Sequence, residues 1–419
     1  FSTTTLLSKT MLTASALRSY RLSTRSNTLH QARTLKASSA LTASVPSSCR
    51  TLHLSSTSAP SQLHLSSTVP RALSFTARSS SQRTMSASAT AVLGTGPMPN
   101  WTWQQSMIRI KDPEKSLVFY RDVMGLTLVD KYDFPQWSFT LYFMQSIPKG
   151  QEYTLEPGSD AAHKYVWSTN GVTIELTHNW GTETKEGPAY HPGNQEKDGF
   201  GHLAFACEDV YKCSEELEAA GVPFKKRPDE GRMKGLAFVY DPDGYWIEIV
   251  ERTPKADAPK YTFAQTMLRV KDPKKSVPFY TAHLGMTLVR ESHFADFSLY
   301  FLATLPQGTD VPDPAGDEAK PFVRGLYAEC VPVLELTHNH GLENDADFVH
   351  NNGNVEPTRG FGHIGFLVDD VYKASDALMA AGVDFQKKPD EGGIKGLAFA
   401  KDPDGYWIEI VKRGQDGKF

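Results

Sequence analysis

The fold is decided by a nine-residue stretch, Asp241-Pro242-Asp243-Gly244-Tyr245-Trp246-Ile247-Glu248-Ile249, which returns without a change as Asp402–Ile410. Three shorter stretches repeat in the same order: Met107–Pro113 returns as Met267–Pro273 with two conservative changes, and Glu175–Asn179 and Gly199–His202 return unchanged as Glu335–Asn339 and Gly360–His363. The offset is 160 residues for the first two of these and 161 for the third and for the nine-residue stretch, so one residue has been inserted between them. Repeats of this fidelity predict a tandem duplication.

Within each copy, the pattern runs strand, helix and further strands, and then repeats. Asp112-Pro113 is typical of a helix start, and Gly125 of its end; a second helix is expected from Asp209 to Gly221. Five alternating runs are expected to be strands: Phe139–Phe143, Val172–Leu176, His202–Ala206, Leu236–Val239 and Tyr245–Val250. We therefore predict an α+β fold of four βαβββ modules with paired, curved mixed sheets, in one domain over residues 101–254 and a second over 260–413.

Charge and composition argue against several classes of function. The chain carries −4 in total, whereas residues 1–100 hold ten Lys or Arg and no Asp or Glu, so the remaining body carries −14. An acidic body is not the footprint of a nucleic-acid partner. No run of 18 apolar residues is present, so we expect no membrane span. The four cysteines have no paired spacing, which favours a protein without disulfides from a reducing compartment.

The first 96 residues are rich in Ser and Thr, carry scattered Arg and lack acids. This composition predicts a disordered organellar targeting segment, addressed to a mitochondrion or a plastid; a plain disordered tail is the alternative. We expect an initiator upstream of Phe1, and Met85 is a candidate start for a shorter cytoplasmic form.

Strand periodicity points to candidate functional side chains. Gln105 and Arg109 share one face of the opening strand, and Glu248 lies between Trp246 and Val250 on a face that is otherwise apolar. A carboxylate there is costly unless it is paired or bound to a metal. Each residue alone has a simpler explanation: a solvated Gln or Glu, a packed His202, or an Arg109 in a surface ion pair. Their presence in both copies adds little, because a recent duplication preserves every residue.

The repeated strings, above all Lys-Gly-Leu-Ala-Phe with Asp-Pro-Asp-Gly-Tyr-Trp-Ile-Glu-Ile, resemble glyoxalase I, the lactoylglutathione lyase branch of the vicinal oxygen chelate superfamily. The resemblance covers about residues 100–413, and it extends to forms with two copies in one chain. It implies a divalent metal, zinc by similarity to the long eukaryotic form and nickel as the alternative, with glutathione as co-substrate.

By the same resemblance, the metal ligands are one Gln, one His and two Glu, shared between copies. One site would combine Gln105 and Glu175 with His363 and Glu409, and the other would combine Gln265 and Glu335 with His202 and Glu248. Both sites then lie inside a single chain, so a monomer suffices.

The resemblance also implies residues that hold the anionic glutathione and line the pocket. They are Arg109, Asn179, Arg269, Asn339, Arg359, Lys226, Lys387, Met233 and Phe238. The first copy departs from the pattern, because Asp198 stands where the second copy has Arg359. We therefore expect weaker glutathione binding at the site that contains His202, with Arg232 compensating in part.

The chemistry implied is isomerisation of the methylglyoxal–glutathione hemithioacetal to S-lactoylglutathione through an enediolate. Glu248 or Glu409 would act as the base, with Glu175 or Glu335 assisting from across the site. The residues by themselves leave two other functions open. A ring-cleaving dioxygenase uses two His and one carboxylate on iron, whereas Gln105 and Gln265 stand where a His is needed. A non-catalytic protein that sequesters a ligand would not need every ligand in both copies.

Overall fold

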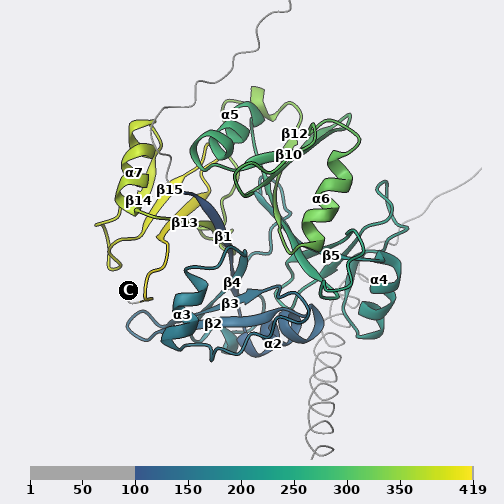
Figure 1. The fold of residues 1–419 in the computed structure, drawn as a ribbon, viewed down its shortest axis with the longest axis horizontal. Helices are drawn as coiled ribbons and strands as arrows, with labels where there is room; N and C mark the ends of the chain where they lie inside the picture. The colour runs from purple at the N-terminus through teal and green to yellow at the C-terminus, as the bar shows by residue number, and fades with distance from the viewer. Residues whose placement is uncertain (1–99, 418–419) are drawn as a thin grey trace, which may run out of the picture. The chain divides into compact units, whose positions relative to one another are not determined.

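The computed structural model describes residues 100–417 (Figure 1). The predicted targeting segment over residues 1–96, the start at Met85 and Cys49 lie outside the described residues. Cys207, Cys213 and Cys330 are all free thiols. Among the described residues, no helix has the length and apolar character that a bilayer crossing requires.

The described chain forms the four predicted βαβββ modules, and the α+β fold is confirmed. Module 1 holds β1 (Thr102–Ile110), α2 (Pro113–Leu117) with the π-helical turn η1 (Val118–Val123), β2 (Thr127–Phe134), β3 (Phe139–Gln145), α3 (Asp160–Val166) and β4 (Thr173–Asn179). After the short 3-10 turn η2 (Thr182–Thr184), module 2 holds β5 (Phe200–Cys207), α4 (Val210–Ala219), β6 (Phe224–Lys226), β7 (Ala237–Tyr240) and β8 (Trp246–Glu251).

The second copy repeats this order. Module 3 holds β9 (Thr262–Arg269), α5 (Pro273–Pro278) with η3 (Phe279–His283), β10 (Thr287–His293), β11 (Phe297–Ala303), α6 (Ala319–Ala328) and β12 (Val333–Asn339). After η4 (Leu342–Asn344), module 4 holds β13 (Phe361–Val368), α7 (Val371–Ala380), β14 (Phe385–Lys387), β15 (Ala398–Lys401) and β16 (Trp407–Lys412).

The helix starts follow the sequence signals. Asp112 caps α2 by accepting a hydrogen bond from the backbone N–H of Glu114, with Pro113 in the first turn, and Asp209 caps α4 in the same way through Lys212. All five predicted strands form, and β4 runs three residues beyond its predicted end at Leu176, to Asn179. Helices α3 and α6 were not predicted. Each lies in the long connection between the last two strands of its module. Helix α6 nevertheless carries apolar residues at helical spacing, since Ala319, Val323 and Tyr327 recur every four residues and are all buried, so the sequence held a signal for it.

Two eight-stranded mixed sheets each unite one module from each copy. Their strand orders are β14-β15-β16-β13-β1-β4-β3-β2 and β10-β11-β12-β9-β5-β8-β7-β6. The joins are antiparallel pairs, β1 with β13 and β5 with β9; Figure 1 shows the dark blue β1 beside the yellow-green β13. The sheets therefore do not follow the division of the sequence into two copies.

The two sheets pack around a pseudo-twofold axis on which equivalent residues of the two copies meet. Ser106 Oγ lies 2.7 Å from Thr266 Oγ1, and the rings of Phe200 and Phe361 stack with their centroids 5.0 Å apart. Residues of both sheets belong to one large buried apolar cluster behind these contacts. Because adjacent strand residues point to opposite faces, Ser106 faces this packing and Gln105 faces the other side of its sheet.

Candidate active sites

The first cluster of polar side chains is built on four adjacent strands of one sheet. Gln105 lies on β1, Glu175 on β4, His363 on β13 and Glu409 on β16. Gln105 Nε2 lies 2.6 Å from Glu175 Oε2, 2.5 Å from Glu409 Oε2 and 3.2 Å from His363 Nε2. All four side chains belong to buried residues, so water does not screen their interactions.

The second cluster repeats this arrangement in the other sheet. Gln265 on β9 donates from Nε2 to Glu248 Oε2 at 2.7 Å and to Glu335 Oε2 at 2.6 Å, and it lies 3.2 Å from His202 Nε2. Each cluster thus takes its Gln and one Glu from one copy and its His and other Glu from the opposite copy. This is the cross-copy combination expected from the resemblance.

The strand register explains why these residues converge. Met107 lies opposite His363 in the antiparallel pair of β1 and β13, and beside Glu175 in the parallel pair of β1 and β4. Gly365 lies opposite Gln105 on β13. A Cβ at Gly365 would come 2.7 Å from Gln105 Cγ, so the glycine leaves the space that the Gln105 side chain fills.

The carboxylates set the protonation of the buried imidazoles. Burial disfavours the charged form of His363, but the charges of Glu409 and Glu175 and their hydrogen bonds outweigh it and raise the pKa of His363 to about 9. Glu248 and Glu335 raise the pKa of His202 to about 9 in the same way. Burial raises the pKa of Glu409, against the opposing effect of His363. Each cluster therefore sets two buried carboxylates against a single imidazole, whose proton a divalent cation would displace on binding.

The two carboxylates of each cluster are held differently. Glu175 Oε1 accepts a hydrogen bond from Thr177 Oγ1 at 3.0 Å, and Glu335 Oε1 accepts one from Thr337 Oγ1 at 3.1 Å. Within the described chain, Glu248 and Glu409 receive their hydrogen bonds at Oε2 alone. One carboxylate of each pair is thus fixed at both oxygens, and the other is free to pivot.

The donor set of each cluster fits a divalent cation. The carboxylates and the imidazole of each cluster offer ligand atoms that lie within 4.8 Å of one another, and all of them are buried. The amide is the fourth donor once its oxygen turns toward the carboxylates, and amide nitrogen and oxygen are assigned from hydrogen bonding alone. Gln105 Oε1 is buried without a hydrogen-bond partner among the described residues, so its present amide orientation leaves an unsatisfied acceptor. One nitrogen and three oxygens suit an octahedral ion with open positions.

Comparisons with known proteins agree with this geometry. The profile of the Glyoxalase/Bleomycin resistance protein/Dioxygenase superfamily matches residues 103–249 and again 262–410. Glyoxalase I of Saccharomyces cerevisiae is 40% identical over 327 residues, which cover 75% of this chain and 94% of that protein. The chain belongs to the glyoxalase family.

Further relatives share the whole two-copy body. A lactoylglutathione lyase of Schizosaccharomyces pombe is 38% identical over 325 residues, 76% of this chain and 99% of that protein. Among solved structures, glyoxalase I from Zea mays superposes with a TM-score of 0.53 at 26% identity, covering 76% of this chain and 94% of the maize chain. The duplicated glyoxalase architecture is therefore shared along nearly the full length of these relatives.

Two arginines flank the clusters on β1 and β9: Arg109 is buried, and Arg269 is half-buried. Arg109 donates from Nη1 to the carbonyl oxygens of Gly353, Gly360 and Phe361 at 3.0–3.3 Å. Arg269 donates to those of Asp198 and Phe200 at 3.3 and 3.2 Å. Burial lowers the pKa of both arginines. In the described chain neither forms a salt bridge with a carboxylate, so each keeps its charge for an anionic ligand.

These contacts depend on two asparagines that the sequence analysis missed. Asn354 Oδ1 accepts from Arg109 Nη2 at 2.9 Å, and Asn194 Oδ1 accepts from Arg269 Nη2 at 2.8 Å. Both asparagines follow a glycine and lie at equivalent positions, 160 residues apart. That repeat was a signal for their role, although neither lies in one of the four strings that defined the duplication.

The remaining polar residues proposed for glutathione differ between the copies. Asn179 donates from Nδ2 to Tyr190 Oη at 2.7 Å, whereas its counterpart Asn339 is exposed. The counterpart of Tyr190 is His350, whose two ring nitrogens are buried without partners among the described residues. Burial and then the charge of Arg269 lower the pKa of His350 to about 4. The Arg359 side chain is 42% exposed, and its charge adds to the effect of burial in lowering the pKa of Arg109.

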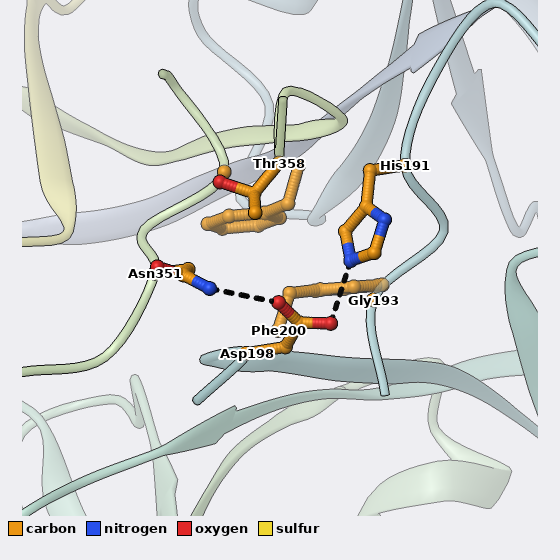
Figure 2. Close-up of a pocket in the computed structure, with 8 residues that line it drawn as sticks. His191, Gly193, Asp198, Phe200, Asn351 and Thr358 are labelled. Atoms are coloured by element: carbon orange, nitrogen blue, oxygen red, sulfur yellow. Dashed lines mark hydrogen bonds and ion pairs between the residues drawn. The ribbon is translucent and has the colours of Figure 1, made fainter. Parts of the chain in front are cut away.

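Asp198 does not face a ligand as the sequence comparison with Arg359 had suggested. Its residue is 4% exposed, and its carboxylate accepts from His191 Nε2 at 2.6 Å, the Gln195 backbone N–H at 2.7 Å and Asn351 Nδ2 at 3.1 Å. Figure 2 shows this carboxylate between His191 and Asn351, which come from opposite copies. Asp198 therefore ties two loops together across the pseudo-twofold axis.

Three more residues predicted to contact the substrate lie on modules 2 and 4: Lys226 and Phe238 on module 2, and Lys387 on module 4. Lys226 Nζ donates to the Leu236 carbonyl at 2.7 Å, and Lys387 Nζ donates to that of Leu397. Burial lowers the pKa of both lysines, against the opposing charge of Glu248 or Glu409. Phe238 lies with its ring centroid 5.3 Å from that of His202.

Arg232 and Met233, on the loop between β6 and β7, lie at the protein surface. Met233 is 37% exposed. Arg232, expected to compensate for Asp198, forms an exposed ion pair with Asp296 at 3.0 Å. The expected compensation by Arg232 is therefore wrong, because its guanidinium pairs with Asp296, and the Asp198 carboxylate is already held by His191 and Asn351.

Proposed function

We propose that this chain is a lactoylglutathione lyase that isomerises the methylglyoxal–glutathione hemithioacetal to S-lactoylglutathione at two sites, and so detoxifies methylglyoxal. The observation that carries the proposal is the pair of buried clusters, each with one Gln, one His and two Glu drawn from both copies. The naming of the two-copy yeast relatives as glyoxalase I and lactoylglutathione lyase supports the same reaction.

A divalent cation held by Gln105, Glu175, His363 and Glu409, or by the equivalent four residues of the second cluster, would polarise neighbouring substrate oxygens as a Lewis acid. Glu409 and Glu248 are the candidate bases, because a base must move toward the sulfur-bearing carbon and only these carboxylates lack a second anchor. Each would take the proton from that carbon. The proton then returns to the neighbouring carbon, assisted from across the site by the anchored Glu175 or Glu335.

The glutathione moiety would bind beside the clusters. Arg109, which is buried, and Arg269, which is half-buried, offer positive charge to its carboxylates, together with Arg359 at the first site. Asn179 and Asn339 would add amide hydrogen bonds, and Lys226 and Lys387 would close the site from the opposite module. Met233 and Phe238 would line the space for the small side group of the substrate.

The test is turnover of preformed hemithioacetal, followed by the thioester absorbance, before and after treatment with a chelator. We expect activity that the chelator removes and that added zinc restores, with nickel as the second candidate. Metal analysis of the purified chain should find two equivalents. Extradiol ring cleavage with iron would instead support a dioxygenase. Tight hemithioacetal binding without turnover or metal would support a sequestering protein.

We further propose that the chain works as a monomer, since both clusters are complete within it, with copies over residues 101–254 and 260–413. Sedimentation of the active chain tests the oligomeric state. The segment over residues 1–96 is proposed to address the protein to a mitochondrion or a plastid, with a cytoplasmic form from Met85. A fluorescent fusion of residues 1–96, imaged in cells against a fusion that lacks the segment, tests this address.

A further inference from the structure

The two clusters differ in how the glutamine amide is held. Gln265 Oε1 accepts a hydrogen bond from Tyr327 Oη at 2.7 Å, whereas Gln105 Oε1 is buried with no partner among the described residues. The amide nitrogens of both residues make the same contacts with their carboxylates. The difference therefore lies on the outward side of the amide, away from the cluster.

The difference follows from one replacement between the copies. Tyr327 lies in the last turn of α6, and the equivalent position, 160 residues earlier, is Trp167 at the end of α3. The Trp167 indole Nε1–H donates to Tyr132 Oη at 2.7 Å. The residue equivalent to Tyr132 is Ser292, which accepts from Arg290 instead. The aromatic side chains at this position therefore form different hydrogen bonds in the two copies.

A tyrosine hydroxyl and the indole that takes its place in the other copy differ in the hydrogen bonds that they can offer to a metal-binding amide. A glutamine that binds a cation through Oε1 must turn its Nε2 outward, where a buried N–H₂ group needs an acceptor. The Tyr327 hydroxyl can accept that hydrogen bond after a rotation about its C–O bond, because a hydroxyl both donates and accepts. An indole N–H only donates, so Trp167 offers no such acceptor to Gln105.

We propose that Tyr327 is a positioning residue that presents Gln265 Oε1 to the divalent cation, so that the cluster containing His202 binds the cation more tightly than the cluster containing His363. The proposal rests on the proposed metal-dependent function. Tyr327 is a buried neighbour of that cluster, 4% exposed, and its hydroxyl contacts the glutamine amide directly. Outer partners of metal ligands commonly alter cation affinity by about 10–100-fold.

The experiment titrates the chelated full-length chain with Co²⁺, followed by calorimetry and by the visible absorption of the bound ion. We expect two binding events of unequal affinity in the unmodified chain. Gln265→Ala should remove the tighter event, which assigns it to the second cluster. Tyr327→Phe should weaken the same event by roughly 10–100-fold and change its absorption spectrum, while leaving the weaker event in place.

Tyr372→Phe is the matched control, because Tyr372 is 48% exposed and its hydroxyl donates to Asp390 on the surface. It should change neither event. A melting curve of each variant separates loss of fold from loss of cation. Unchanged affinities in Tyr327→Phe, in a chain that binds two Co²⁺ ions, would overturn this proposal alone. Absence of cation binding in the unmodified chain would overturn the proposed function as well.

Discussion

Gln105 Nε2 lies 3.2 Å from His363 Nε2, although 258 positions separate the two residues in the sequence. The contact exists because β1 pairs with β13 and places residues of opposite copies on neighbouring strands. The second cluster depends on the equivalent pairing of β5 with β9. Neither copy by itself can hold a complete cluster within one molecule.

A strictly monomeric fragment of residues 100–256 should therefore lack cation binding at the affinity of the whole chain. It would retain Gln105 and Glu175 on one strand pair, and His202 and Glu248 on another, with no β9 or β13 to join them. Calorimetric titration of the monomeric fraction from size exclusion checks this expectation. Adding residues 257–417 should restore binding, and full binding by the monomer alone would contradict the cross-copy arrangement.

Glu409→Gln should abolish turnover at the first cluster and leave the second, so total activity falls but persists. Glu248→Gln should do the reverse. The double variant should lose roughly 10²–10⁴-fold in activity, because general-base catalysis contributes about this factor, and should still bind a hemithioacetal analogue. Initial rates of thioester formation measure the effect. Wild-type turnover by the double variant would rule out both glutamates as bases.

Asp198→Asn should lower the free energy of unfolding by about 1–3 kcal/mol, because its carboxylate holds charge-assisted hydrogen bonds with His191 and across to Asn351. Half-saturation by hemithioacetal at the second site, measured in the Glu409→Gln background, should stay within about twofold. Urea unfolding and saturation kinetics give the two readouts. Glu196→Gln, on the exposed part of the same loop, is the matched control. Tighter substrate binding in Asp198→Asn would show instead that the carboxylate repels the ligand.

Asp241→Asn should make the free energy of unfolding fall less steeply as the pH rises. Burial, reinforced by the neighbouring Asp243, raises the pKa of Asp241 to about 8. A carboxyl whose pKa is raised on folding contributes stability at low pH, and this contribution is lost as pH rises through the folded pKa. We expect the unfolding free energy of the parent chain, relative to Asp241→Asn, to fall by roughly 1 kcal/mol or more between pH 6 and pH 8. Urea unfolding at these two pH values measures the difference, and parallel pH profiles would contradict it.

The sequence by itself determined the four βαβββ modules and the eight residues of the two clusters. The repeated strings set the number of modules, and Asp-Pro pairs and glycines marked where helices start and stop, because capping and turn geometry are local properties. Glu248 and Glu409 stood out as carboxylates on apolar faces. Their grouping with Gln, His and the second Glu came from the resemblance, since none of them shows short ligand spacing.

Only the tertiary structure decided what depends on contacts between distant segments. The Asp198 side chain was misread because its partners, His191 and Asn351, meet only across the pseudo-twofold axis. Asn354 and Asn194, which hold the two arginines, likewise act through loops of the opposite module. The difference between Tyr327 and Trp167 was visible as a replacement, but its meaning required the hydrogen bond to Gln265. A side-chain partner is set by three-dimensional packing, whereas strand and helix periods are written along the chain.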